Sequence, residues 1–205
     1  MPVWGIVVAA GGGQRFGGPK QYEVLAGRRV VDWARQTMSR VCEGVVMVVP
    51  PDRIEHREPG AHRVVAGGDT RSASVRAGLA AVADDADIVV VHDGARPLAS
   101  IELFRRVIDA VRDGADAAVP GLAVSDTIRS LDGGTVDRSR LVTVQTPQAF
   151  RADALRRAHD GEPDATDDAA LVEDAGGYVV VVEGEHRNIK ITTPFDMRFA
   201  AFLLS

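Results

Sequence analysis

The sequence predicts an α/β protein in which a mostly parallel sheet lies between two layers of helices. Four short runs of Val and Ile lack polar alternation and are bounded by Gly, Pro or Asp, as in strands buried on both faces. These runs cover residues 3–10, 45–49, 88–91 and 178–182. Segments with helical spacing of apolar residues alternate with them along residues 1–120. The alternation implies right-handed crossovers and a three-layer α/β/α sandwich.

Helices are expected where apolar residues recur every three or four positions and so form one stripe. The first stripe runs from Val30 to Val41, and the second runs from Leu103 to Val111. A last helix is predicted over residues 195–204. Thr193 and Pro194 precede it as a typical cap and a typical first-turn proline.

Residues 124–146 interrupt the strand–helix alternation. Two extended, partly polar segments flank Asp132-Gly133-Gly134, which is typical of a hairpin turn. A hairpin with so few apolar residues is not stable by itself, so we expect it to lie on another part of the protein, such as a second subunit. The chain is therefore predicted to be one domain, residues 1–205, with a protruding β-hairpin arm.

Composition excludes several classes of partner. The chain has 24 Lys and Arg against 29 Asp and Glu, a net charge of −5, which argues against a broad surface for nucleic acid or anionic membrane. Aromatic residues make up 5%, which disfavours a platform for stacking RNA bases. Any anion-binding site must therefore be local.

Targeting and redox signals are also informative. No apolar run approaches the ~20 residues of a membrane span, and no basic region or cleavage motif precedes the run that starts at Val3. The cytoplasm is therefore the expected location. Cys42 is the only cysteine, so an internal disulfide is excluded.

A glycine-rich segment, residues 9–21, directly follows the first predicted strand. Glycine backbone at the carboxyl end of a parallel strand allows N–H groups to approach phosphates. The segment is not a dinucleotide fingerprint, because Phe16 stands at the third glycine position, and it is not a P-loop, because Pro19 precedes Lys20. Arg15 and Lys20 add two cations, so we predict an anion-binding loop. The alternative is a mobile surface turn with solvated charges.

Residues 12–20 resemble the glycine loop of nucleotidyltransferases that join a sugar or alditol phosphate to a nucleoside triphosphate. Seven further segments are similar, in the same order, to motifs of the 2-C-methyl-D-erythritol 4-phosphate cytidylyltransferase family. They are residues 67–75, 91–97, 125–127, 136–138, 146–148, 166–168 and 188–192. The resemblance covers nearly the whole chain and implies a Rossmann-like form of the predicted sandwich, with the hairpin as a dimerisation arm.

The resemblance implies an enzyme that transfers CMP from CTP to the phosphate of 2-C-methyl-D-erythritol 4-phosphate. The products would be 4-diphosphocytidyl-2-C-methyl-D-erythritol and pyrophosphate, in the non-mevalonate route to isoprenoids. Mg²⁺ or another divalent cation is the implied cofactor. The implied assembly is a homodimer whose sites are shared through the arm.

The residue types agree with this chemistry. A phosphate monoester has a second pKa near ~6, so the attacking group is already an anion at neutral pH and needs no general base. The sequence offers five scattered histidines and no Ser/His/Asp arrangement. The protein must instead hold two polyanions together and stabilise a crowded phosphoryl centre, which requires Lys, Arg and a divalent cation.

The resemblance also implies roles for individual residues. Catalytic roles are implied for Arg15, Lys20 and Lys190. Nucleotide-binding roles are implied for Ala9, Ala10, Gly11, Gly12, Gly68, Asp69 and Ser74. Roles at the acceptor substrate are implied for Asp93, Arg96, Thr127, Arg138 and Thr166. Asp93 is also expected to lie beside the metal.

Each of these motifs has a structural alternative. For Lys190 the alternative is a solvated lysine on an edge strand, and for Asp93 it is a cap of the turn after its strand. For Asp69 or Ser72, taken alone, the alternative is the N-cap of the helix that follows. The two arm residues have the alternative of ordinary surface positions.

Two other functions stay open. One is a cytidylyltransferase for another alditol phosphate, such as ribitol 5-phosphate, because such relatives share the CTP motifs. The other is a catalytically inactive nucleotide-binding module, against which the presence of both Lys20 and Lys190 argues. His92 is expected to be buried and structural, whereas Arg71 and Gln148 are either structural or functional.

Overall fold

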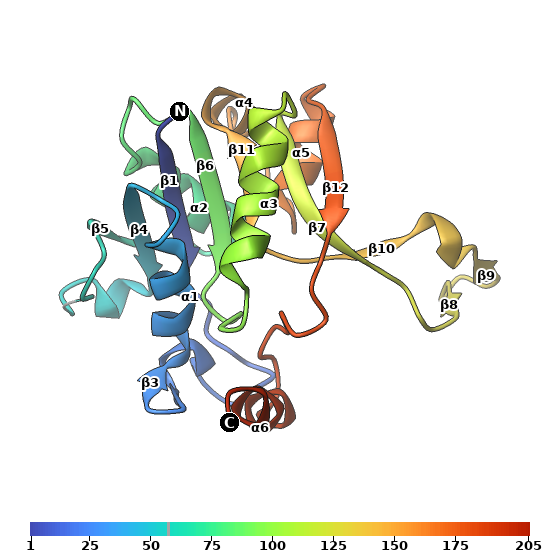
Figure 1. Cartoon of the computed structure of the whole chain (residues 1–205), viewed down its shortest axis with the longest axis horizontal. Helices are drawn as coiled ribbons and strands as arrows, with labels where there is room; N and C mark the ends of the chain where they lie inside the picture. Colours follow the sequence, from blue (N-terminus) through green and yellow to red (C-terminus); the bar gives the residue numbers. More distant parts are fainter. Residues whose placement is uncertain (57) are drawn as a thin grey trace.

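The computed structural model describes residues 1–56 and 58–205 (Figure 1). One sheet runs through the molecule in the order β5-β4-β1-β6-β11-β7, and β12 pairs with β7 on its outer side. Its strands are β1 (Val3–Val8), β4 (Gly44–Val49), β5 (Arg63–Ala66), β6 (Ile88–Asp93), β7 (Ala117–Ala123), β10 (Val142–Val144), β11 (Gln148–Arg151) and β12 (Val179–Glu183). In the described sheet every antiparallel pairing involves β10 or β11, and all other neighbouring strands are parallel, so the predicted mostly parallel sheet is confirmed.

Helices cover both faces of this sheet. On one face lie α1 (Val30–Met38) and α3 (Ile101–Arg112), and on the other lie α2 (Arg71–Ala80), α4 (Ala152–Ala158) and α5 (Asp168–Asp174). Successive strand residues face opposite layers: Val45 and Met47 pack with α1 and α3, whereas Val46 and Val48 pack with α2 and α4. The three-layer sandwich is therefore confirmed. Within the described residues, no helix has the length and hydropathy needed to cross a membrane.

Two predicted strands differ from their expected form. The run over residues 178–182 is not buried on both faces, because β12 lies at the edge of the sheet and leaves Val181 56% exposed. The first strand ends at Val8 rather than at residue 10. Ala9 and Ala10 instead begin the loop at the carboxyl edge of the sheet, where they line the cavity described below.

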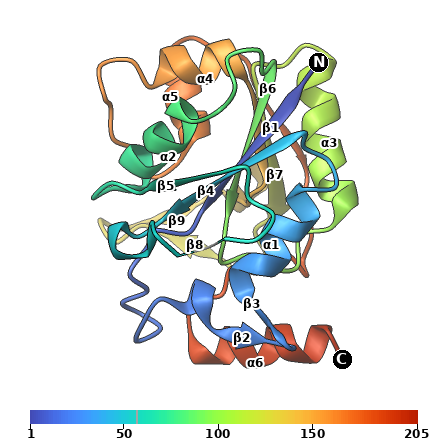
Figure 2. The same cartoon turned by 90° about the vertical axis from the view of Figure 1, so that its left-hand side faces the viewer.

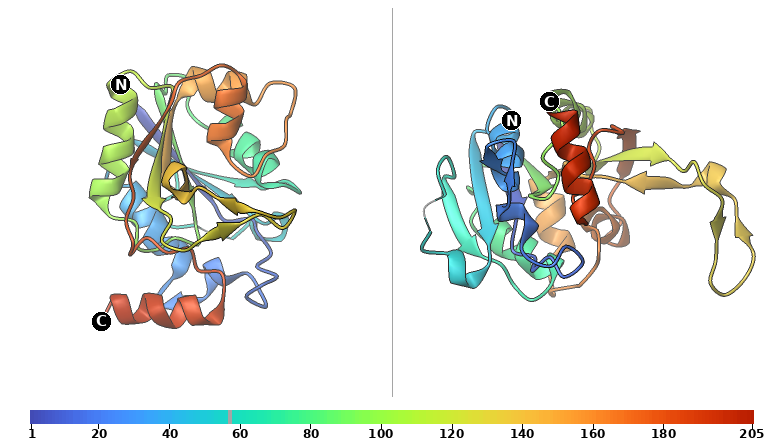
Figure 3. Two further views of the ribbon diagram at one scale, coloured as in Figure 1. Left: turned by 90° about the vertical axis from the view of Figure 1, so that its right-hand side faces the viewer. Right: turned by 90° about the horizontal axis from the view of Figure 1, so that it is seen from below.

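The predicted hairpin arm is confirmed. β10 pairs with the end of β7, and beyond them β8 (Ile128–Arg129) pairs antiparallel with β9 (Thr135–Val136) around a turn that includes Gly133. The arm projects away from the body of the molecule, as Figure 1 and the right-hand view of Figure 3 show. Five of its large apolar side chains are exposed to solvent, namely Leu131, Val136, Leu141, Val142 and Val144.

The C-terminal segment lies beneath the carboxyl edge of the sheet. The predicted last helix is α6 (Pro194–Leu203), whose start is fixed by a capping box between Thr193 and Asp196. It packs against the small ribbon formed by β2 (Val24–Leu25) and β3 (Arg28–Arg29) (Figure 2). The loops at the carboxyl edge of the sheet therefore lie near α6 and the β2–β3 ribbon.

Candidate functional site

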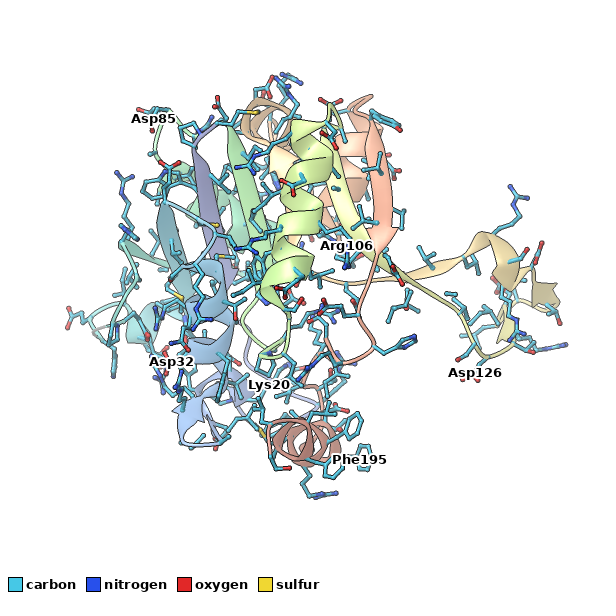
Figure 4. All side chains as sticks on the ribbon, in the orientation of Figure 1. Lys20, Asp32, Asp85, Arg106, Asp126 and Phe195 are labelled. Carbon is cyan, nitrogen blue, oxygen red and sulfur yellow. The ribbon has the colours of Figure 1, made fainter. Side chains whose placement is uncertain are left out.

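A cavity of about 320 Å³ opens at the carboxyl ends of β1 and β6. Parallel strands of one sheet end at the same edge, so their following loops converge there. The cavity is lined by the loop after β1, by Lys20 and Gln21, by the start of α2, by the turn after Asp93, and by Lys190. In Figure 4, Lys20 lies below this edge of the sheet and above α6.

Gln21 fixes the loop that follows β1. Its side chain is buried, and its Nε2 donates to the carbonyl oxygens of Ala9 (2.7 Å) and Gly11 (2.8 Å). The Tyr22 hydroxyl donates to the same Ala9 oxygen at 3.3 Å. Further along the loop, Gly13 has a φ of +68°, and a Cβ there would lie 1.8 Å from a backbone oxygen. Hydrogen bonds from Gln21 and Tyr22 therefore hold the backbone of this loop, and its conformation requires glycine at position 13.

The second wall of the cavity is the start of α2. The N-cap of this helix is Thr70, whose hydroxyl accepts from the Ala73 N–H at 3.1 Å, so the alternative of Asp69 or Ser72 as the cap is wrong. Ser74 Oγ donates to the Gly68 oxygen at 3.3 Å. The free N–H groups and dipole of a helix start favour an anion at this wall.

Asp93 is the centre of the charged groups at the cavity floor. Its Oδ2 lies 2.9 Å from Lys190 Nζ and 3.5 Å from Arg96 Nε, and its Oδ1 lies 4.0 Å from Arg71 Nε. Burial alone would raise the pKa of Asp93, but these three cations outweigh it and hold the pKa well below its usual range. Asp93 is thus a carboxylate surrounded by cations rather than a simple turn cap.

Positive charge is concentrated around this carboxylate. Burial, Lys190 and Arg15 lower the pKa of Lys20, whereas Asp93 acts in the opposite direction. The sequence contains only two lysines, Lys20 and Lys190, and both line the cavity. Every other cation among the 24 Lys and Arg side chains is an arginine. The cavity can therefore hold a polyanion.

The lowered pKa of Lys20 gives a direct prediction. With lysine labelled at ¹⁵Nζ, NMR should show two side-chain signals, of which that of Lys20 titrates below the ordinary lysine pKa. Its ammonium is then lost at a lower pH than that of a solvated lysine, and its attraction for an anion declines as the pH rises through this value. Asp93→Asn should lower the Lys20 pKa further, because it removes the charge that raises it. Asp69→Asn is the control, and an unchanged Lys20 titration is expected.

His92, by contrast, has the structural role that was expected. It is fully buried, and its ring lies between Thr146 Oγ1 (3.0 Å) and the Arg96 carbonyl oxygen (3.1 Å). Burial lowers the pKa of His92 to about 4, so the ring is neutral at physiological pH. Gln148, which was left open, is buried outside the cavity lining, where its Nε2 donates to Asp167 Oδ2 at 3.1 Å.

The cavity brings together most of the predicted site residues. Those that line it are Ala9, Ala10, Gly11, Gly12, Lys20, Gly68, Asp69, Ser74, Asp93 and Lys190. Arg15 is exposed outside the lining, although its charge acts on Lys20. Arg96 lies behind Asp93, where it also donates to the Asn188 carbonyl oxygen at 2.9 Å.

Besides Arg15 and Arg96, three further predicted residues lie outside the lining of this cavity. Thr166 is exposed on the loop before α5, and Thr127 and Arg138 are exposed on the arm. Arg138 donates to the Ser125 carbonyl oxygen. Figure 4 shows the neighbouring Asp126 well away from Lys20. Their roles at the acceptor substrate stay predictions.

The cavity also contains residues to which no role was given. They are Val8, Gln21, Thr70, Arg71 and Ala95. Gln21 directly follows Lys20, and Arg71 follows the cap of α2, but neither position has a signal of its own in the sequence. The sequence does contain one signal for the cavity lysines: lysine is so scarce that Lys20 and Lys190 are the only two, and both line the cavity.

Known proteins provide an independent comparison. A family model described as 2-C-methyl-D-erythritol 4-phosphate cytidylyltransferase matches residues 3–205. A protein of that name from Rhodococcus jostii (strain RHA1) is 46% identical over 220 residues, which cover 99% of this chain and 95% of that protein. One from Streptomyces avermitilis is 40% identical over 98% of this chain and 90% of its own length. The solved structure of the protein of that name from Thermus thermophilus has a TM-score of 0.86 and 36% identity, and covers 99% of this chain and 98% of its own.

Proposed function

The chain belongs to the 2-C-methyl-D-erythritol 4-phosphate cytidylyltransferase family, and from this premise we propose that it transfers CMP from CTP to 2-C-methyl-D-erythritol 4-phosphate in isoprenoid biosynthesis. One observation carries the proposal for this cavity. A glycine loop, a helix start and the only two lysines of the chain surround one carboxylate, Asp93. This arrangement suits a nucleoside triphosphate beside a second phosphate.

The nucleophile needs little help from the protein. An oxygen of the substrate phosphate attacks the α-phosphorus of CTP, the bond to the bridging oxygen of the β-phosphate breaks, and pyrophosphate leaves. The phosphate is already an anion at neutral pH. None of the described residues that line the cavity is a histidine, in agreement with a reaction that needs no general base.

The cations of the cavity would hold the two phosphate-bearing substrates together and stabilise the charge of the reacting phosphoryl group. Lys20 and Lys190 would flank the reacting α-phosphate, and Arg15 would bind the triphosphate from the loop. Lys190 is 42% exposed and makes its ion pair with Asp93 at the cavity surface, so its ammonium can turn to a phosphate oxygen. Fixed cations that meet the developing charge lower the barrier without reorganisation during the reaction.

A divalent cation fits beside Asp93. Among residues 1–56 and 58–205, no three His, Cys, Asp or Glu side chains form a metal-binding group. Mg²⁺, however, is commonly held by one or two carboxylates together with phosphate oxygens of the substrate. Asp93 supplies such a carboxylate in its ionised form. When bound, Mg²⁺ would neutralise charge on the triphosphate and on the departing pyrophosphate.

The nucleotide would lie against the loop after β1 and the start of α2. Ala9, Ala10, Gly11 and Gly12 on one wall and Gly68 and Ser74 on the other are small, so a flat base can approach backbone donors and acceptors there. The residues proposed here are Ala9, Ala10, Gly11, Gly12, Gly68, Asp69 and Ser74. A Cβ on Gly67 would lie 2.3 Å from Ala10 Cβ, so the two walls approach each other too closely for a larger residue.

Gln21→Met should weaken CTP binding by up to about 30-fold, because the Ala9 and Gly11 carbonyl oxygens lose the Gln21 amide as a donor and each such hydrogen bond contributes about 1 kcal/mol net. Calorimetric titration with CTP and Mg²⁺ would measure the change. Tyr22→Phe is the matched control, since it removes one long hydrogen bond to the same loop and should change the affinity much less. Equal losses in both variants would contradict a special role for Gln21.

The acceptor would be bound partly by a second subunit. We assign its phosphate to Thr127 and Arg138 of an arm, and the rest of its pocket to Arg96 and Thr166. Because the arm projects from the body and exposes apolar side chains, a homodimer would bury those side chains and bring the arm to a neighbouring cavity. A guanidinium and a hydroxyl together suit a terminal phosphate.

The proposed function is tested by Mg²⁺-dependent release of pyrophosphate. CTP would be offered with 2-C-methyl-D-erythritol 4-phosphate or with ribitol 5-phosphate, and the other nucleoside triphosphates would replace CTP in control reactions. Turnover is expected only with CTP and methylerythritol phosphate. Turnover with ribitol 5-phosphate instead would overturn the acceptor, and no turnover with any pair would overturn the reaction.

A further inference from the structure

A buried carboxylate lies directly behind the cavity. Asp168, the first residue of α5, is fully buried, and its Oδ2 lies 2.6 Å from a terminal nitrogen (Nη1) of Arg71. Its Oδ1 lies 3.1 Å from Nε2 of His159, which is also buried. A buried charge is costly unless it is paired, so this carboxylate needs Arg71.

Arg71 connects that carboxylate to the cavity. It is the first residue of α2, it lines the cavity, and its side chain is 23% exposed. Asp168 holds Nη1, and Nε lies 4.0 Å from Asp93, at the longest of the three cation distances to that carboxylate. The guanidinium has five N–H donors, so donors remain for a ligand in the cavity.

We infer that Arg71 is a further triphosphate-binding residue and that Asp168 is the positioning residue that sets its orientation. The inference rests on the proposed function, because it takes CTP as the ligand of the cavity. Without Asp168, the ion-pair partner left to Arg71 would be Asp93, which Lys190 and Arg96 already approach, because Asp167 acts on Arg71 only from beyond ion-pair distance. Asp168 therefore keeps the guanidinium from moving onto Asp93, the carboxylate that pairs with Lys190 and that would hold the metal.

His159 completes the arrangement from the far side of Asp168. With the proton on Nε2, the ring donates to Oδ1, and Nδ1 keeps only a lone pair, which is the less costly atom to leave without a partner in this buried position. One oxygen of Asp168 thus binds His159 while the other binds Arg71. This fixes the plane of the carboxylate and hence the direction of the guanidinium.

The chain offers a matched control for the general packing of this region. Ser72 Oγ donates to the Ala165 oxygen at 2.9 Å and accepts from the Ala165 N–H at 3.0 Å. These bonds join the same two segments, the start of α2 and the loop before α5, but do not involve Arg71 or Asp168. Ser72→Ala therefore loosens the contact and leaves the ion pair in place.

The test is a double-mutant cycle on the binding of CTP with Mg²⁺, measured by calorimetry on the full chain. Asp168→Asn and Arg71→Gln should each weaken binding by about 10- to 100-fold, and the double variant should bind no more than about threefold worse than the weaker single variant. Ser72→Ala should stay within about threefold of the wild type. Losses that multiply in the double variant, or a Ser72→Ala loss equal to that of Asp168→Asn, would overturn the inference.

A second variant covers the case in which Asp168→Asn does not fold. His159→Phe leaves the Asp168–Arg71 pair and removes one donor, so it should weaken CTP binding in the wild type but not in the Arg71→Gln background. An equal loss in both backgrounds would overturn the inference. Wild-type turnover is measured separately: a chain that binds CTP with the expected coupling but releases no pyrophosphate contradicts the proposed reaction, not the role of Asp168.

Discussion

Lys190→Met should reduce the rate of pyrophosphate release by about a thousandfold, since a cation that meets charge in the transition state commonly contributes 10²–10³ or more to turnover. The side chain is partly exposed and pairs with Asp93 at the cavity, so the substitution removes charge without opening the core. The thermal unfolding temperature should change little. Steady-state pyrophosphate release at saturating CTP, together with a melting curve, measures both quantities.

Lys20→Met should have an effect of the same order, because Lys20 lines the same cavity and its ammonium is influenced by the charge of Asp93, the carboxylate with which Lys190 pairs. Arg106→Met is the control: it removes one partly buried cation of α3, which donates to the Glu183 carbonyl oxygen and does not line the cavity, and it should leave turnover unchanged. Near-normal turnover of both lysine variants would show that the cavity is not the site of the reaction.

The strands buried on both faces were predictable from sequence because uninterrupted runs of Val and Ile indicate such burial. β1, β4 and β6 lie between helices on both sides, and a run of Val and Ile is what such a position requires. β7 contains Pro120 and Gly121, and β11 carries Gln148 and Arg151. These strands depend on pairing with partners far along the chain rather than on their own composition, so no local pattern indicates them.

The site was predictable only where it follows strand ends. The glycine loop after β1 and Asp93 at the end of β6 meet because parallel strands end at one edge. Lys190 follows no such rule: resemblance implied its place at the cavity, and the scarcity of lysine is the one further signal in the sequence. The pair of Arg71 and Asp168 lies 97 residues apart and exists because α2 packs near α5, which no sequence pattern specifies.

Arg138→Ala should reduce turnover by about a hundredfold or more and raise the KM for methylerythritol phosphate. A guanidinium can form two parallel hydrogen bonds to one phosphate, and water does not replace that bidentate contact. The residue is exposed on the arm, so the fold should be unaffected. Arg140→Ala, in the same short turn over Arg138–Arg140, is the matched control and should retain activity. Equal losses in the two variants would indicate a general effect of charge on the arm.

The strongest consequence of a shared site is complementation. Lys190→Met inactivates the body of a subunit, and Arg138→Ala inactivates its arm, so each variant is expected to be nearly inactive alone. In an exchanged equimolar mixture, half of the dimers combine the two variants, and one of their two sites has an intact body and an intact arm. Turnover should then recover to about a quarter of the wild-type value. If the subunits exchange, as shown by native mass spectrometry, and turnover does not recover, then the arm serves its own subunit and the shared site is wrong.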